Sequence, residues 1–268
     1  MVEGPGVHDV GFEELVAEAE SAPLEGWEFS FLEGRATEER PSWAYARTLV
    51  ARAGSADALL DVQTGGGEVL AEVLAEVSAQ PLGGRRPATV AATESFSPNV
   101  DLARRHLAPF GVDVAEVADD AALPFADGTF DLVVSRHPTV VIWDEIARVL
   151  EAGGAYLSQQ VGPGANRALT DYLMGEQPVN SRRSPERAVA EATAAGLVVV
   201  DLRVENPQLV FHDIGAVVYF LRKVPWTVPG FTVTAYRDRL ARLHARLRSE
   251  GPFISHAPRF LIEARKPG

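Results

Sequence analysis

Short apolar runs alternate with helical patterns along most of the chain, starting near residue 57. Seven runs have the length of buried strands, and they lie at 58–62, 89–92, 112–117, 130–134, 155–159, 197–204 and 260–264. Helical patterns separate several of these runs, and each ends within a few residues of a Gly or Pro: 68–79, 98–107, 143–150 and 185–195. Strands that alternate with helices favour a parallel sheet covered on both faces, so the pattern predicts a doubly wound α/β fold.

Two regions depart from this alternation. Residues 1–56 have an amphipathic segment at 11–20 and a helix from about Pro41 to Ala53, and we interpret them as an N-terminal helical segment. The remainder, 57–268, is predicted to be one domain with a helical cap insertion at about 206–256, before the last strand. The second helical pattern of this insertion has the stripe of a core-facing helix, formed by Val233, Tyr236, Leu240, Leu243 and Leu247.

Composition places the chain among ordinary globular proteins and narrows its partners. The hydrophobic fraction of 46% and the charged fraction of 23% exclude disordered, collagen-like and low-complexity classes. The formal net charge of −12 opposes binding to phosphate backbones and to anionic lipid, so nucleic acid is not the expected partner. The chain has no cysteine, which excludes disulfides, thiolate zinc sites and a cysteine nucleophile.

The termini and the charge pattern give expectations about location and metals. Acidic residues stand where a secretory signal peptide has positive charge, and no segment approaches 18 uninterrupted apolar residues. We therefore expect a cytoplasmic protein with no membrane partner, and its pattern is compatible with a monomer or a homodimer. The six His have no metal-ligand spacing to acidic neighbours, so no catalytic metal is expected.

The strongest local signal is an apolar strand that ends in Asp and continues into a glycine cluster and a helix, LLDVQTGGGE at 59–68. Gly65, Gly66 and Gly67 allow the backbone to approach a ligand closely. The N–H groups at the helix start and the Asp61 carboxylate supply polar contacts. A glycine cluster can also form a simple tight turn that binds no ligand. The residues at the neighbouring strand ends therefore decide between the two interpretations.

Carboxylates follow the next two predicted strands. Glu94 ends the second strand, where an acid is suited to accept the hydroxyl protons of a ribose. Asp119 and Asp120 follow the third strand, where one of them could accept a hydrogen bond from an adenine amino group. The three strand ends together predict a site for a nucleoside-containing ligand.

In this order the segments resemble the class I S-adenosylmethionine-dependent methyltransferases over roughly residues 57–160. The resemblance implies a Rossmann-like, seven-stranded methyltransferase sheet with helices on both faces. It implies S-adenosylmethionine as cofactor and S-adenosylhomocysteine as product. It also implies cofactor contacts, which are assigned to Asp61, Gly65, Gly66, Gly67, Glu94, Ser95, Phe96, Asp119, Asp120 and Ser135.

One position departs from the family pattern, because Gln63 stands where the loop usually has Gly. The departure leaves open a protein that binds S-adenosylmethionine without catalysis. A nicotinamide-binding domain would use the same architecture. The fingerprint of such a domain is G-x-G-x-x-G followed by an acidic residue about 20 residues later. In this chain the glycines are contiguous and the acidic residue comes later than that, so the fingerprint is not matched.

Methyl transfer depends mainly on alignment, and a base is needed only where the acceptor must lose a proton. His137 follows the fourth strand and is the candidate catalytic base, although it could equally shape the turn before Pro138. The family's Asp/Asn-Pro-Pro-aromatic signature for amino-group methylation is absent there. Candidate substrate contacts are Arg136, His212, Tyr219 and Arg222.

The prediction is therefore methyl transfer from S-adenosylmethionine to a small-molecule acceptor by in-line displacement. The alternatives are an rRNA or tRNA methyltransferase, against which the acidic balance counts, and a non-catalytic S-adenosylmethionine-binding protein. The resemblance also implies that residues 1–56 form an N-terminal helical lid segment over the cofactor. Aromatic residues at 27–31 and 43–45 could stack on the adenosine or the acceptor, with packing of the lid core as the alternative.

Overall fold

The computed structural model describes residues 11–24, 29–79 and 85–268. The chain divides into two units, each assembled from three segments. Unit 1 comprises 1–39, 164–178 and 207–257, and unit 2 comprises 40–163, 179–206 and 258–268. The structure does not divide at the expected boundary between residues 56 and 57. Helix α2 (Tyr45–Ala53) belongs to unit 2, where it packs against α3 (Glu68–Ala79).

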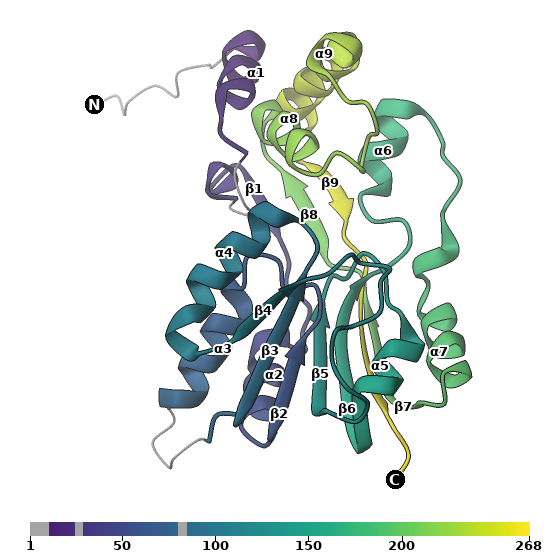
Figure 1. Cartoon of the computed structure of the whole chain (residues 1–268). Coiled ribbons are helices and arrows are strands. Elements are labelled where there is room, and N and C mark those ends of the chain that lie inside the picture. Colours follow the sequence, from purple (N-terminus) through teal and green to yellow (C-terminus); the bar gives the residue numbers. More distant parts are fainter. Residues whose placement is uncertain (1–10, 25–28, 80–84) are drawn as a thin grey trace, which may run out of the picture. The chain divides into compact units, whose positions relative to one another are not determined.

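Within the described residues of unit 2, seven strands form one sheet in the order β4-β3-β2-β5-β6-β10-β7 (Figure 1). The strands are β2 (Ala58–Asp61), β3 (Thr89–Glu94), β4 (Asp113–Glu116), β5 (Phe130–Arg136), β6 (Leu150–Val161), β7 (Val198–Glu205) and β10 (Arg259–Arg265). The first five in the order pair in parallel, whereas β10 pairs antiparallel with both β6 and β7. The predicted Rossmann-like α/β fold is confirmed.

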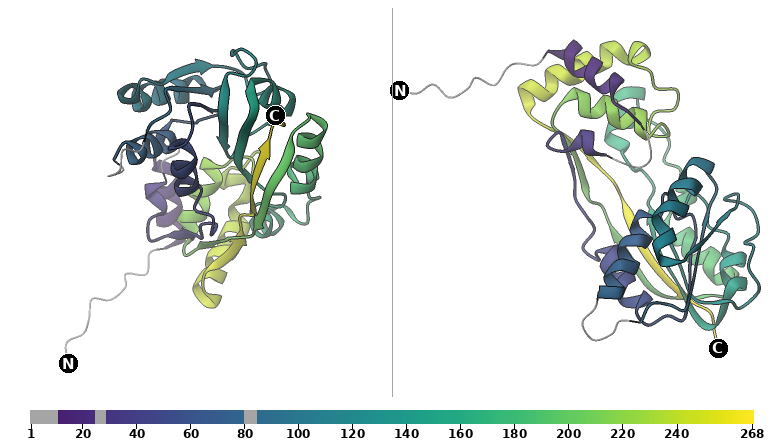
Figure 2. Two further views of the ribbon diagram at one scale, coloured as in Figure 1. Left: turned by 90° about the horizontal axis from the view of Figure 1, so that it is seen from below. Right: turned by 60° about the vertical axis from the view of Figure 1, so that its left-hand side comes forward.

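Helices cover both faces of this sheet (Figures 1 and 2). Helices α2, α3 and α4 (Ser97–Leu107) pack on one face, and α5 (Trp143–Val149) and α7 (Pro185–Ala194) pack on the other. Leu59 packs in the core beneath α2, α3 and α4, and its neighbour Leu60 packs in the core beneath α5 and α7. Both side chains are fully buried. Successive strand residues point to opposite faces, so a strand covered on both sides reads as a continuous apolar run.

Unit 1 is a small antiparallel sheet packed against helices. Its described strands are β1 (Ala36–Glu38), β8 (Gln208–Phe211) and β9 (Phe253–His256), in the order β1-β8-β9. Its helices are α1 (Phe12–Ser21), α6 (Arg167–Met174), α8 (Ile214–Lys223) and α9 (Val233–Glu250). Nearly every residue of α8 is buried, because this helix is apolar all round and packs against both α1 and α9.

The sequence pattern predicted a helical insertion at 206–256, but the structure shows that the insertion is not entirely helical. Its two predicted helices are α8 and α9, and the stripe residues Leu240, Leu243 and Leu247 of α9 are buried. It also contains β8 and β9, which pair with each other, while β8 pairs with β1. Short 3-10 helices cover Ser30–Leu32 in unit 1, and Ala108–Phe110 and Ser181–Arg183 in unit 2.

Candidate functional site

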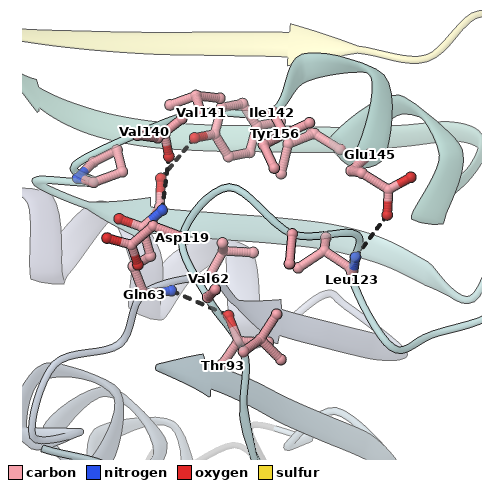
Figure 3. Close-up of a pocket in the computed structure, with 16 residues that line it drawn as sticks. Val62, Gln63, Thr93, Asp119, Leu123, Val140, Val141, Ile142, Glu145 and Tyr156 are labelled. Atoms are coloured by element: carbon pink, nitrogen blue, oxygen red, sulfur yellow. Dashed lines mark hydrogen bonds between the residues drawn. The ribbon is translucent and has the colours of Figure 1, made fainter. Parts of the chain in front are cut away.

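Polar side chains meet at the carboxyl-terminal edge of the unit 2 sheet. They come from the glycine loop after β2, the end of β3, the loop after β4 and the loop after β5. These segments line a cavity (Figure 3), to which Val62, Gln63, Thr93, Asp119, Ser135 and Tyr156 contribute. The lining leaves a cavity volume of about 20 Å³. This edge is where ligands of doubly wound sheets bind.

The glycine loop has a backbone path that only small residues follow easily. Gly65 and Gly67 have φ angles of 66° and 80°, in the left-handed region. A Cβ atom on Gly67 would also lie 3.0 Å from side-chain atoms of Leu107 on α4. Gly66 between them is buried, and its carbonyl oxygen lies 2.7 Å from His106 Nδ1. The loop is therefore held close to both α3 and α4.

Gln63 follows the same left-handed path, with a φ angle of 59°. Its side chain reaches the loop after β5, where Oε1 accepts a hydrogen bond from Thr139 N at 2.6 Å. Its Nε2 donates to the Val140 carbonyl at 2.7 Å (Figure 3). A backbone N–H only donates and a carbonyl only accepts, so the orientation of the Gln63 amide is fixed at both ends.

Asp61, at the end of β2, is 7% exposed, and its Oδ2 accepts a hydrogen bond from the Thr64 hydroxyl at 2.7 Å. Burial raises the pKa of Asp61 to about 7, and the charge of Glu94 adds to this effect. The Thr64 hydrogen bond and the charge of Arg136 oppose the increase in pKa. Asp61 is therefore a carboxyl that changes charge near neutral pH.

Glu94, at the end of β3, supports the loop with both carboxylate oxygens. Oε2 accepts a hydrogen bond from Gly65 N at 2.8 Å, and Oε1 accepts one from Phe96 N at 3.0 Å. Each oxygen has a further lone pair, so Glu94 can hold the loop and still accept hydroxyl protons. Ser95 is half-buried and the Phe96 side chain is 60% exposed, and neither lines the cavity.

Of the two predicted adenine acids, the structure places Asp119 in the cavity lining and leaves Asp120 exposed. The Thr139 hydroxyl donates a hydrogen bond to Asp119 Oδ2. The same hydroxyl lies 3.1 Å from Gln63 Oε1, so its single proton is shared between two acceptors. Asp119 is thereby connected to the glycine loop through Thr139.

A partly buried ion pair between Glu145 and Arg148 of α5 holds the loop that follows Asp119. Glu145 accepts a hydrogen bond from Leu123 N at 2.7 Å (Figure 3), and Arg148 donates to the carbonyls of Leu123 and Phe125. The hydrogen bonds from Arg148 lower the pKa of Glu145, which stays ionised. The sequence analysis missed this pair, although the spacing Glu145 to Arg148 on one helix face could have indicated it.

A buried hydroxyl network forms the wall at the ends of β5 and β6. Ser135 Oγ lies 2.6 Å from the Tyr156 hydroxyl and 2.9 Å from Ser158 Oγ. The Tyr45 hydroxyl donates to the Ser135 carbonyl at 3.1 Å. Burial raises the pKa of Tyr156 to about 12, so this phenol stays protonated. Ser135 therefore lines the cavity as part of a network that the sequence analysis did not identify.

His137 is held by a second network, in which Trp43 Nε1 donates to Gln159 Oε1 at 2.7 Å. An indole N–H only donates, so the Gln159 amide nitrogen faces His137 Nε2, at 2.9 Å, and donates to it. Burial holds the pKa of His137 well below its usual range, and neighbouring positive charges add to this: Arg136, Arg259 and Arg183. The imidazole is therefore neutral, with its proton on Nδ1.

The predicted substrate residues are divided between the two units. Arg136 is an exposed residue at the end of β5 in unit 2, and His212 is an exposed residue of unit 1. Tyr219 lies in the core of unit 1, where its ring stacks on Phe31 with a centroid distance of 4.6 Å. Arg222 donates to the Ala22 carbonyl at 3.1 Å. Of the predicted aromatic lid residues, Trp27 lies outside the described residues.

Metal-ion sites and membrane-spanning helices would each bear on function. Among residues 11–24, 29–79 and 85–268, no group of three or more His, Asp or Glu could hold a metal ion. Over these same ranges, no helix combines the length and the apolar character that crossing a bilayer requires.

The donor set of the cavity fits an adenosyl group. Apolar side chains make up most of its lining, Asp119 contributes a carboxylate acceptor to it, and Glu94, which follows the lining residue Thr93, is a second acceptor just outside the lining. The volume of about 20 Å³ is enough for only one or two water molecules. Pockets for ligands of this size have about 300–1,000 Å³. The chemistry therefore fits the cofactor, and the cavity must widen to hold it.

Comparisons with known proteins agree with this geometry. A family model described as a methyltransferase domain matches residues 60–158. Among curated proteins, none is similar enough in sequence to count as a match. A candidate methyltransferase from Bacillus halodurans has a TM-score of 0.56 at 18% identity, over 83% of this chain and 99% of that chain. The YcgJ protein from Bacillus subtilis has a TM-score of 0.57 at 17% identity, over 83% and 98%. At these identities the likeness shows a shared fold.

Proposed function

Because residues 60–158 form a methyltransferase domain of the class I S-adenosylmethionine-dependent family, we propose that the protein methylates a small-molecule acceptor. The observation that supports this most directly is a cavity at the carboxyl-terminal edge of the sheet, which Gln63 of the glycine loop and Asp119 line, while Glu94 is hydrogen-bonded to the same loop at Gly65 N. The net charge of −12 favours a small acceptor over RNA, because phosphate contacts would be repelled. The absence of cysteine fits a cytoplasmic location.

Glu94 is proposed to hold the ribose hydroxyls, and Asp119 the adenine amino group. Asp61 and the loop at Gly65 and Gly67 are proposed to contact the methionine part. When bound, S-adenosylmethionine supplies a methyl group that its sulfonium already activates. The contribution of the chain is to bind, orient and exclude water, since in-line alignment supplies most of the rate.

A base role for His137 stays a prediction, and the geometry limits its form. The Nε2 lone pair of the neutral imidazole already accepts a hydrogen bond from Gln159. His137 can therefore take a proton from an acceptor only after this bond is exchanged. The proposed reaction depends first on alignment, and on proton transfer only for acceptors that must lose a proton.

The proposal is tested by calorimetry with S-adenosylmethionine and S-adenosylhomocysteine. Binding in the micromolar range, roughly −8 kcal/mol, is expected. Glu94→Ala should weaken binding by about 1.5–3 kcal/mol, because charge-assisted hydrogen bonds and the support of the glycine loop are lost. Glu72→Ala, which removes the same charge from an exposed position on α3, is the matched control.

Two results would change this assignment. If neither ligand gives heat or a thermal shift, the proposed function is wrong. If both bind but no methyl transfer reaches any of a panel of hydroxyl, amine and carboxylate acceptors, the protein is better described as a non-catalytic S-adenosylmethionine-binding protein.

A further inference from the structure

The side chain of Gln63 joins three segments that line the cofactor cavity. It stands in the glycine loop, and its amide forms hydrogen bonds with backbone groups of Thr139 and Val140 in the loop after β5. The Thr139 hydroxyl continues the connection to Asp119 in the loop after β4. We call these hydrogen bonds the Gln63 bridge. They tie together the segments from which the adenosyl group would have to be contacted.

The bridge depends on a side chain at this one position. The backbone at Gln63 has a φ angle of 59°, which glycine adopts without strain and other residues adopt at a cost. Glycine here would keep the path of the loop and remove every hydrogen bond that the Gln63 side chain makes in the bridge. The choice of Gln therefore introduces both backbone strain and a connection across the cavity.

The size of the cavity indicates what the bridge does. Gln63, Asp119 and Val140 all line a cavity of about 20 Å³, which is too small for an adenosyl group. The rest of the lining includes strand residues Thr93, Ser135 and Tyr156, and the loop at Leu123, which is hydrogen-bonded to Glu145 and Arg148. The loop at Thr139 and Val140 is exposed, so separating it from Gln63 is the direct way to widen the cavity.

We propose that Gln63 controls access to the cofactor site, and that S-adenosylmethionine binds only after the Gln63 bridge has opened. This inference rests on the proposed function, because it concerns the same site. The protein then exists as a closed form with the bridge and an open form without it, and only the open form is competent to bind. Its measured affinity is lowered by the fraction of molecules that are open.

The test compares four proteins for binding of S-adenosylhomocysteine: wild type, Gln63→Gly, Gln63→Asn and Gln208→Asn. Asn tolerates the left-handed backbone but is one methylene too short to reach both Thr139 N and Val140 O, so it removes the bridge without adding strain. Gln208→Asn makes the same chemical change at an exposed position of unit 1 and is the matched control.

Opening of the bridge predicts opposite changes in affinity and in ligand-free stability. Both Gln63 variants should bind about tenfold more tightly than wild type, which corresponds to about 1.4 kcal/mol. The melting temperature of ligand-free Gln63→Asn should fall by a few degrees, because hydrogen bonds of the closed form are lost. In stopped-flow measurements the observed rate should reach a plateau with ligand concentration for wild type and rise linearly for the variants.

The other outcomes overturn the proposal. Equal affinity in wild type and both Gln63 variants would show that the bridge does not limit access, while the proposed function would stand. Weaker binding in the variants would show that Gln63 holds the cofactor instead of excluding it. Absence of binding in all four proteins would overturn both the control of access and the proposed function.

Discussion

Asp61 is a buried carboxyl that destabilises the folded state by an amount that depends on pH. An Asp in the unfolded chain ionises near pH 4, whereas the pKa of Asp61 in the folded protein is about 7. Between these values the unfolded state has released its proton and the folded state has kept it. Stability is therefore lost as the pH rises through this range, and the loss is complete above pH 7.

Asp61→Asn should remove this loss. The amide keeps an oxygen that can accept the Thr64 hydrogen bond but carries no charge. The free energy of unfolding should rise by about 2 kcal/mol near pH 8 and change little near pH 4.5. Urea unfolding at both pH values measures this free energy, and Asp113→Asn at an exposed position is the control. An equal effect at the two pH values would contradict the assignment.

His137 should remain a neutral imidazole with its proton on Nδ1 at and below neutral pH. Replacing its partner, Gln159→Glu, puts a carboxylate where the amide nitrogen now donates, so the pKa of His137 should rise. Nitrogen-15 NMR of the labelled imidazole follows both the tautomer and the titration. A wild-type spectrum with the proton on Nε2, or no rise of the pKa in the variant, would contradict the proposed orientation of Gln159.

The sequence was a good guide to residues that act through local segments and a poor one to residues that act through distant partners. The glycine cluster after β2, Glu94 at the end of β3 and Asp119 soon after β4 lie at strand ends as predicted, and their contacts with a cofactor stay predictions. The contacts of Gln63 with Val140 and of Trp43 with Gln159 join residues 77 and 116 positions apart. No local pattern reports such a pair, so the state of His137 could not be predicted.

At the scale of elements, α8 is the centre of unit 1, and Tyr219 shows what its burial implies. The ring is 3% exposed and stacks on Phe31, so its first role is packing and not contact with an acceptor. Tyr219→Ala should lower the stability of unit 1 by about 3 kcal/mol, and Tyr219→Phe by much less. Chemical denaturation measures this, with exposed Thr234→Ala on α9 as control. A loss of stability in Thr234→Ala as large as in Tyr219→Ala would contradict this packing role.

Elements that belong to the alternation of strands and helices were predicted well, and strands outside it were missed. The range predicted for the first helix of the sheet domain, 68–79, coincides with α3, and the seven predicted runs correspond to the seven strands of the unit 2 sheet. Strands β2 and β4 have only 4 residues each, but their place between helical patterns indicated them. Strands β1, β8 and β9 are as short, with 3, 4 and 4 residues, and lie outside that alternation.

At the scale of the whole molecule, net charge gives a prediction about RNA. Because the chain carries a formal net charge of −12, long-range repulsion opposes contact with phosphates. The Arg-rich helix α9 is the segment that could overcome it locally. Filter binding near physiological salt should retain no more RNA than an acidic reference protein does. Retention that falls steeply with added salt would instead support an RNA acceptor.

The position of β10 has a consequence for how the protein is made. This strand lies between β6 and β7, yet it is the last of the three to leave the ribosome. At about 5–20 residues per second, roughly 5–20 s separate the emergence of β6 from that of β10. During this time one side of β6 has no strand to pair with, and an apolar strand with an open edge invites association with other chains. The nascent protein is therefore exposed to association through β6 until β10 has emerged and closed that edge.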